Sequence, residues 1–255
     1  MANYTIPNLR NACRTLSHIA TREEALSLSQ LAAELDVPRT TMLRIVCTLE
    51  EQGFLVKDAN GYRTGPVMLQ LGLKAVDRVD IRSCTGPVLK RLATATGETA
   101  HIAQRAGNQM LILDVSDGPN VIRVASRPGT QAHMHCSATG KVILANAIED
   151  LSSFIAGLDL QKRTRKTITR KADLLKELAT TRQRGYGLDD GEYHESVRCL
   201  AVPVRDSQNQ VIAGIGITAS TTTFPKSRIP EIVQKVKSAA RDLESALRQP
   251  DMAKV

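Results

Sequence analysis

Residues 26–53 read LSLSQLAAELDVPRTTMLRIVCTLEEQG, and this stretch predicts two short helices joined by a tight turn. Ser27 can cap the first helix, and Gln30 three residues later completes a capping box. The second helix is expected over residues 38–52, because proline is favoured in a first helical turn and Gly53 supplies a C-terminal stop. Two helices at this spacing are typical of a helix-turn-helix that reads DNA.

The neighbouring segments complete a winged helix-turn-helix. Residues 8–20 carry apolar side chains at helical spacing and predict a preceding helix. Residues 54–57 and 62–64 are strand-forming runs around Asn60-Gly61, a strong hairpin signal. We therefore expect a DNA-binding domain over residues 1–64. A small helical domain that docks proteins instead of DNA is the alternative interpretation.

The helix predicted over residues 38–52 has one apolar face and one polar face. Arginine can bind guanine through two hydrogen bonds, and threonine can reach a phosphate or a thymine methyl group. Leu43 on the polar face either packs against the preceding helix or makes an apolar contact in the groove. Cations of the wing could hold phosphates. The predicted DNA-contacting residues are Arg39, Thr40, Thr41, Leu43, Arg44, Lys57 and Arg63.

The rest of the chain has the mixed pattern of a second, α/β domain, expected over residues 81–250. A helix over residues 66–79, within a linker spanning 65–80, would join the two domains. Further helices are predicted over 81–95, 138–147, 172–184 and 227–247, and strands over 99–105, 110–115, 121–126, 199–205 and 210–218.

Composition narrows the classes of function. The hydrophobic content of 42% is enough for a folded core. Aromatic residues make up only 3%, which is unlike a stacking platform for single-stranded nucleic acid. Neither a membrane-spanning run nor a signal sequence is visible, so a cytoplasmic protein without a membrane partner is expected. Five widely spaced cysteines without a C-x-x-C pair predict reduced thiols.

Three motifs occur in order along the chain: the helix-turn-helix of residues 26–53, MHCSATGK at 134–141, and RGYGLDDGE at 184–192, which continues to VRCLAVPV at 197–204. Together they resemble the IclR-type bacterial transcription regulators over nearly the whole chain. The resemblance implies an α+β fold in which a winged helix-turn-helix is joined by a linker helix to a GAF/profilin-like effector-binding domain. It also implies a regulator without enzyme activity or cofactor, which acts as a homodimer or dimer of dimers on a double-stranded DNA operator.

The resemblance further implies a small-molecule effector, an organic acid or aromatic metabolite. The start of the helix at 138–147 is built from small residues, so its backbone N–H groups are open to an anion such as a carboxylate. An ordinary tight helix start is the alternative. Asp189 could accept a hydrogen bond from a ligand hydroxyl. The effector-contacting residues that the resemblance implies, with Gly140 of the same helix start, are Ala138, Thr139, Gly140, Asp189, Val197, Cys199, Gly216 and Thr218.

Two other functions stay open. Cys199 with His194 and Asp189 could form the nucleophile of a small-molecule thiol hydrolase, although apolar surroundings would raise the pKa of this thiol. A redox regulator could use Cys47 or Cys199. His133 and His135 lack the carboxylate or cysteine partners of a metal site, so no metal is predicted.

The net charge of +8 does not lie in the predicted DNA-binding domain. Residues 1–64 hold seven basic and seven acidic side chains, whereas the rest of the chain holds 27 basic and 19 acidic ones. Part of the excess lies in the basic run at residues 162–171. This run is expected to be a solvated loop, and a further phosphate contact is the alternative.

Overall fold

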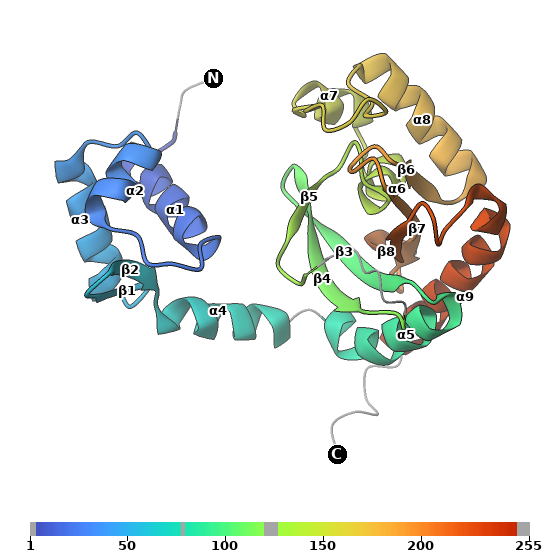
Figure 1. Ribbon diagram of the computed structural model, residues 1–255, viewed down its shortest axis with the longest axis horizontal. Coiled ribbons are helices and arrows are strands. Elements are labelled where there is room, and N and C mark those ends of the chain that lie inside the picture. The colour runs from blue at the N-terminus through green and yellow to red at the C-terminus, as the bar shows by residue number, and fades with distance from the viewer. Residues whose placement is uncertain (1–3, 78–79, 120–126, 249–255) are drawn as a thin grey trace. The chain divides into compact units, whose positions relative to one another are not determined.

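Two units follow one another along the chain, one over residues 1–79 and one over residues 80–255 (Figure 1). The computed structural model describes residues 4–77, 80–119 and 127–248. The strand expected over residues 121–126 lies outside the described residues. Each unit is considered by itself below.

The first unit is the expected winged helix-turn-helix. Its elements are α1 (Pro7–Ala20), α2 (Leu28–Glu34), α3 (Arg39–Glu51), β1 (Leu55–Asp58), β2 (Gly61–Thr64) and α4 (Pro66–Asp77). The capping box is present, because Ser27 Oγ accepts from the Gln30 N–H and Gln30 Oε1 accepts from the Ser27 N–H. Gly53 has a φ of +73° and ends the helix in the left-handed region, where glycine is favoured.

A single apolar core holds this unit together. Leu31, Met42, Val46 and Leu55 are fully buried, so α2, α3 and the wing share one hydrophobic cluster. The wing is an antiparallel pair of β1 and β2, and the backbone of Leu26 adds a bridge to Tyr62 on its other side. Since the wing is tied to the segment before α2, it is fixed relative to α3.

The second unit contains a six-stranded antiparallel sheet with the strand order β5-β4-β3-β8-β7-β6. The strands are β3 (Thr99–Ala106), β4 (Gln109–Ser116), β5 (Gln131–His133), β6 (Gly187–Asp190), β7 (Val197–Arg205) and β8 (Val211–Ser220). The short strands β5 and β6 were not expected, because three or four residues are too few to show an alternating pattern.

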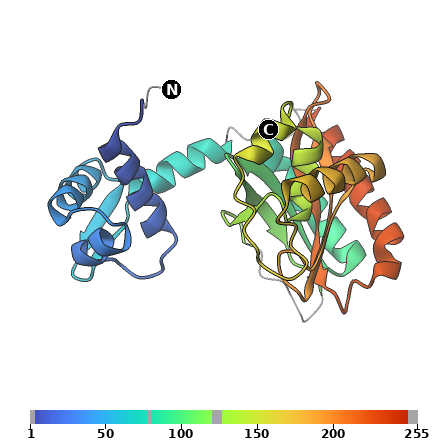
Figure 2. The ribbon, with the colours of Figure 1, turned by 90° about the horizontal axis from the view of Figure 1, so that it is seen from above.

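Helices cover both faces of this sheet (Figure 1 and Figure 2). They are α5 (Asp80–Thr96), α6 (Ala138–Asn146), α7 (Leu151–Ala156), α8 (Lys171–Arg184) and α9 (Ile229–Leu247). Gly214 of β8 packs against Thr139 of α6, so the alternation of side chains turns Ile215 and Ile217 to the opposite face, where α5 and α9 lie. The curved α+β architecture expected from the sequence is therefore confirmed.

Two details of the helices differ from the expectation. The last helix begins at Ile229 after a 3₁₀ turn over Lys226–Arg228, and not at Ser227. The short helix α7 was missed, because six residues cannot display a helical period. None of the helices in the described part is both long and apolar enough to cross a membrane.

Candidate functional site

The outward face of α3 presents most of the predicted DNA-contacting residues. Arg39, Thr40 and Arg44 are exposed, and Leu43 is 45% exposed instead of being packed against α2. Thr41 is half-buried and, with Arg44, lines a groove against α1. The first two turns of α3 thus offer two cations, a hydroxyl and an apolar side chain to a partner.

The wing cations are engaged within the wing. Arg63 forms an ion pair with Asp58 at 2.7 Å, and Lys57 Nζ lies 5.6 Å from the centre of the Tyr62 ring. Asp58 also accepts the N–H groups of Asn60 and Gly61, which closes the turn. Both predicted phosphate-holding cations are exposed, but Arg63 already has a carboxylate partner.

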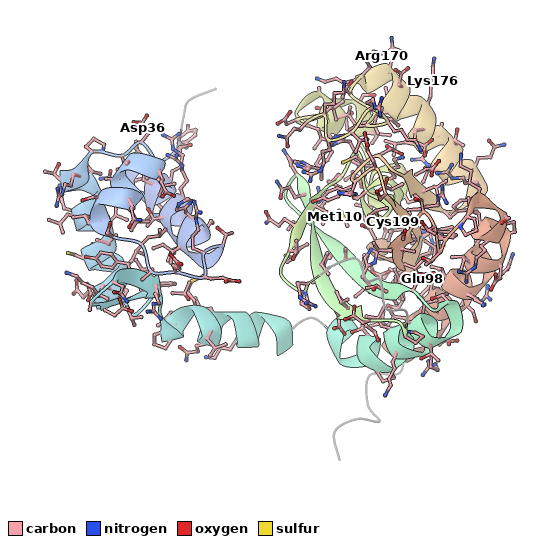
Figure 3. All side chains as sticks on the ribbon, viewed as in Figure 1. Asp36, Glu98, Met110, Arg170, Lys176 and Cys199 are labelled. Atoms are coloured by element: carbon pink, nitrogen blue, oxygen red, sulfur yellow. The ribbon has the colours of Figure 1, made fainter. Side chains whose placement is uncertain are left out.

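A cavity of about 400 Å³ lies in the second unit between the sheet and the N-terminal end of α6. This volume is within the range of small-molecule sites. Met110 of β4 and Cys199 of β7, both of which line it, lie in the interior of this unit (Figure 3). The cavity brings together six of the eight predicted effector-contacting residues: Ala138, Thr139, Asp189, Val197, Cys199 and Thr218.

The other two predicted residues, Gly140 and Gly216, do not line the cavity. A Cβ at Gly140 would lie 2.3 Å from the carbonyl oxygen of Met134, and one at Gly216 would lie 2.1 Å from that of Leu200. Both glycines are therefore required for close approach of backbone to backbone.

Polar side chains from neighbouring strands form a row across one wall of the cavity. Asp189 of β6 is paired in register with Cys199 of β7, which is paired with Thr218 of β8. Cys199 Sγ lies 3.3 Å from Thr218 Oγ1, which lies 3.3 Å from Nδ1 of His101 on β3. Cross-strand register thus aligns residues that are far apart in sequence. His101 was not predicted from the sequence.

Asp189 has one carboxylate oxygen that is satisfied and one that is not. Its Oδ1 accepts the N–H groups of Glu192 at 2.6 Å and Tyr193 at 3.3 Å. Its Oδ2 is buried without a hydrogen-bond partner among the described residues. Burial raises the pKa of this carboxyl to about 6, although the two N–H groups and Lys141 favour the charged form. Because unsatisfied buried polar atoms are rare, Oδ2 is a candidate ligand contact.

The other titratable groups of the row are neutral at pH 7. Burial lowers the pKa of His101 to about 4. Burial, reinforced by the charge of Asp189, raises the pKa of the Cys199 thiol well above its ordinary value. A nucleophilic cysteine needs the opposite shift, and Cys199 contacts Thr218 while His194 Nδ1 accepts from the Ser196 N–H. The geometry does not favour the thiol-hydrolase interpretation.

The start of α6 forms another wall of the cavity. Ser137 caps the helix by accepting the N–H of Gly140 at 3.2 Å, and its own hydroxyl donates to the His133 carbonyl. The first N–H groups of a helix, here those of Ala138 and Thr139, have no acceptor within the helix. Since both residues line the cavity, it combines N–H donors with the carboxylate of Asp189.

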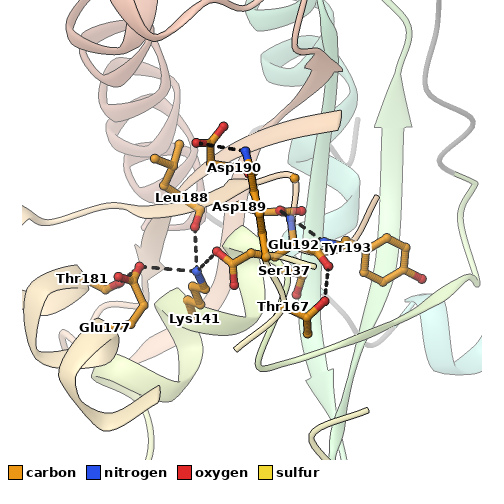
Figure 4. A network of polar contacts seen from close by, with 12 residues as sticks. Ser137, Lys141, Thr167, Glu177, Thr181, Leu188, Asp189, Asp190, Glu192 and Tyr193 are labelled. Carbon is orange, nitrogen blue, oxygen red and sulfur yellow. Dashed lines mark hydrogen bonds and ion pairs between the residues drawn. The ribbon is translucent and has the colours of Figure 1, made fainter. Parts of the chain in front are cut away.

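A buried ion cluster lies behind this wall (Figure 4). Lys141 of α6 is 1% exposed, and its Nζ donates to the Leu188 carbonyl at 2.9 Å. The same Nζ contacts Glu192 and lies 3.4 Å from Glu177 of α8, which also accepts from Arg184. Burial raises the pKa of Glu192 to about 7 against the opposing effect of Lys141. We name Lys141, Glu177, Arg184 and Glu192 the buried ion cluster.

The buried ion cluster was missed by the sequence analysis. Lys141 is followed by the apolar run Val142–Ala145, and only this charge at the start of a buried helix could have indicated it. No three metal-ligating side chains come together in the part of the chain that the structure describes.

A winged helix-turn-helix followed by an α/β unit with a cavity that has one polar wall is the arrangement of the DNA-binding transcriptional regulators. The family model of the IclR helix-turn-helix domain matches residues 9–59, and that of the bacterial transcriptional regulator IclR C-terminal domain matches residues 73–245. The chain belongs to the IclR family of bacterial transcriptional regulators.

Individual relatives agree with this assignment. The chain is 32% identical to the regulator BhcR of Paracoccus denitrificans over 86% of this chain and 79% of the relative. It is 30% identical to the regulator KipR of Bacillus subtilis, over 88% of this chain and 91% of the relative. The fold is also that of an IclR homologue from Microbacterium hydrocarbonoxydans crystallised with 4-hydroxybenzoate, with a TM-score of 0.80 and 22% identity over 95% and 99% of the two chains.

Proposed function

We propose that this regulator binds a double-stranded operator through α3 and the wing, and that a small organic acid in the cavity of the second unit modulates this binding. Residues 1–64 would read DNA, residues 65–80 would link the units, and residues 81–250 would hold the effector. A homodimer or dimer of dimers would read two half-sites, as helix-turn-helix proteins do. The protein acts as a regulator and not as an enzyme in this proposal.

The observation that carries the effector proposal is the unpaired Oδ2 of Asp189 in a cavity that also offers the first N–H groups of α6. The N–H groups of Ala138 and Thr139 suit a carboxylate, because the positive end of the helix dipole adds to their attraction. Oδ2 suits a hydroxyl or amino donor of the same ligand. The effector is therefore proposed to be a small acid that also bears a hydrogen-bond donor.

A thermal-shift comparison of 4-hydroxybenzoate with 4-hydroxybenzamide tests this proposal. At one hundred times its Kd, a bound acid stabilises the native state by about 2.7 kcal/mol, which corresponds to an increase in Tm of roughly 5–10 °C for a chain of this size. The amide keeps the ring and the hydroxyl but lacks the charge, so a much smaller shift is expected. Other small hydroxy acids are measured against their amides in the same way.

The control for this experiment is Val197→Phe, which fills the rim of the cavity. Without ligand, the variant should have the same Tm as the parent. Addition of the acid should not raise the Tm of the variant. Equal shifts with acid and amide would argue against the carboxylate site at α6, and an unchanged shift in Val197→Phe would place the acid outside the cavity.

Replacing Arg44 with alanine should weaken operator binding by about 1–3 kcal/mol, as expected for an arginine that reads a base. The measurement is a fluorescence-anisotropy titration, at fixed salt, of a duplex selected from random DNA. Arg22→Ala is the matched control. It removes the same charge from the same unit, at an arginine that is paired with Glu34. Equal losses in the two variants, or an equal loss on unselected DNA, would exclude base reading by Arg44.

A further inference from the structure

The basic sequence of residues 162–171 predicts a solvated loop, but residues 163–167 are bonded to another part of the chain. Its side chains bond to the backbone of residues 190–193, which begin at the last residue of β6. Thr164 and Thr167 are buried, and Thr167 Oγ1 also accepts the N–H groups of Arg163 and Thr164, which fixes the loop. We name residues 163–167 the clamp loop and residues 190–193 the wall segment.

Each carbonyl of the wall segment accepts a hydrogen bond from the clamp loop. Lys166 Nζ donates to the Asp190 carbonyl at 3.0 Å, and Thr164 Oγ1 donates to that of Gly191 at 2.8 Å. Thr167 Oγ1 donates to the Glu192 carbonyl at 2.7 Å, and Arg163 Nε donates to that of Tyr193 at 3.2 Å. The guanidinium of Arg163 also lies 4.0 Å from the centre of the Tyr193 ring, within cation–π range.

The inner side of the wall segment faces the cavity. The N–H groups of Glu192 and Tyr193 donate to Asp189 Oδ1, and Tyr193 lines the cavity together with His194 and Val197. The backbone of the wall segment is thus held from inside by Asp189 and from outside by the clamp loop, while the side chains of Glu192 and Asp190 pair with Lys141 and Arg198. The outer bonds from Arg163 and Lys166 are exposed to solvent, which makes them easier to break than the buried bonds from Thr164 and Thr167.

We propose that the clamp loop holds the wall segment closed over the cavity, and that Arg163 is a positioning residue that sets how often this wall opens. Arg163 joins the exposed end of the clamp loop to the residue of the wall segment that lines the cavity. Loss of its hydrogen bond and ring contact should leave the fold intact and make opening more frequent. The proposal rests on the proposed function only in assigning the cavity to an effector.

Cys199 is partly buried and lines the cavity together with Tyr193 of the wall segment, so it supplies a readout that needs no effector. Methyl methanethiosulfonate is added to the full chain, and peptide mass spectrometry follows the labelling of each cysteine. In Arg163→Ala, labelling of Cys199 should be roughly three- to tenfold faster, the range for one lost hydrogen bond. Amide hydrogen exchange at Glu192 and Tyr193 should be faster by a similar factor. Both rates are measured without an effector, so they test this proposal even if every effector screen fails.

Three controls separate this role from a general loss of structure. Cys136 is fully buried and does not line the cavity, so its labelling rate and the Tm should not change. Lys162→Ala removes a neighbouring exposed cation and should behave as the parent, whereas Arg163→Lys, which keeps a donor for the Tyr193 carbonyl, should restore part of the protection. Parent-like labelling of Cys199 in Arg163→Ala would overturn the proposal, as would acceleration of Cys136 by the same factor.

Discussion

Replacing Lys141 with methionine should lower the free energy of unfolding by about 3–5 kcal/mol, the cost of removing one partner from a buried ion pair. Methionine has a similar length and keeps the packing of the apolar stem. It leaves Glu192 buried without its cation, and the Leu188 carbonyl loses its donor. Urea denaturation followed by far-UV circular dichroism measures the change.

A second substitution distinguishes the charge from the packing. Glu192→Gln in the Lys141→Met background removes the unpaired charge, so the double variant should be more stable than Lys141→Met alone. Lys176→Met changes an exposed lysine of α8 (Figure 3) and should stay within about 0.5 kcal/mol of the parent. If the effects of the two substitutions simply add, Lys141 and Glu192 are not coupled as the structure indicates.

Sequence reasoning succeeded in the first unit because the determining signals are local. The capping box of Ser27 and Gln30, the stop at Gly53 and the turn at Asn60-Gly61 each involve residues at most three positions apart. Such signals do not depend on tertiary contacts. The same locality explains the correct prediction of the exposed face of α3, where burial alternates with the helical period.

The second unit could be predicted only in part, because its site depends on register and on contacts between distant segments. Asp189, Cys199 and Thr218 were predicted from the family resemblance, but their alignment in a row follows from strand pairing that no motif encodes. Lys141 and Glu192 are 51 residues apart, so neither predicts the other. The clamp loop was predicted to be solvated because of its basic residues, whereas its threonines make the hydrogen bonds that fix its structure.

The pH dependence of stability should identify the charge state of Asp189. Burial raises the pKa of Asp189 in the folded protein to about 6, from an ordinary value of 3.8. Between these values the folded state holds a proton that the unfolded state has released, so the stability of the parent falls as the pH rises through this window. The asparagine side chain of Asp189→Asn does not titrate, so the variant lacks this pH dependence. The stability of the variant minus that of the parent should therefore increase by roughly 2 kcal/mol between pH 4 and pH 7.

Most of this difference comes from Asp189, because His101 titrates in both proteins and its contribution cancels. Besides burial, the charge of Asp189 helps to raise the pKa of Glu192, so part of the Glu192 contribution changes with the substitution. The lowered pKa of His101 makes stability rise with pH, and the raised pKa of Glu192 makes it fall, so the parent curve alone would be ambiguous. Asp190→Asn is the matched control on the same strand. Burial alone would raise the pKa of Asp190, but hydrogen bonds from Arg198 and Lys226 lower it, so this carboxyl titrates below the window and its difference should stay flat from pH 4.5 to 7.5.

A flat difference for Asp189→Asn as well would mean that Asp189 is ionised throughout and that its second oxygen is satisfied in solution. An increase would mean instead that, above about pH 6, the cavity holds an unpaired charge, which a ligand hydroxyl or amino group can stabilise by hydrogen bonding.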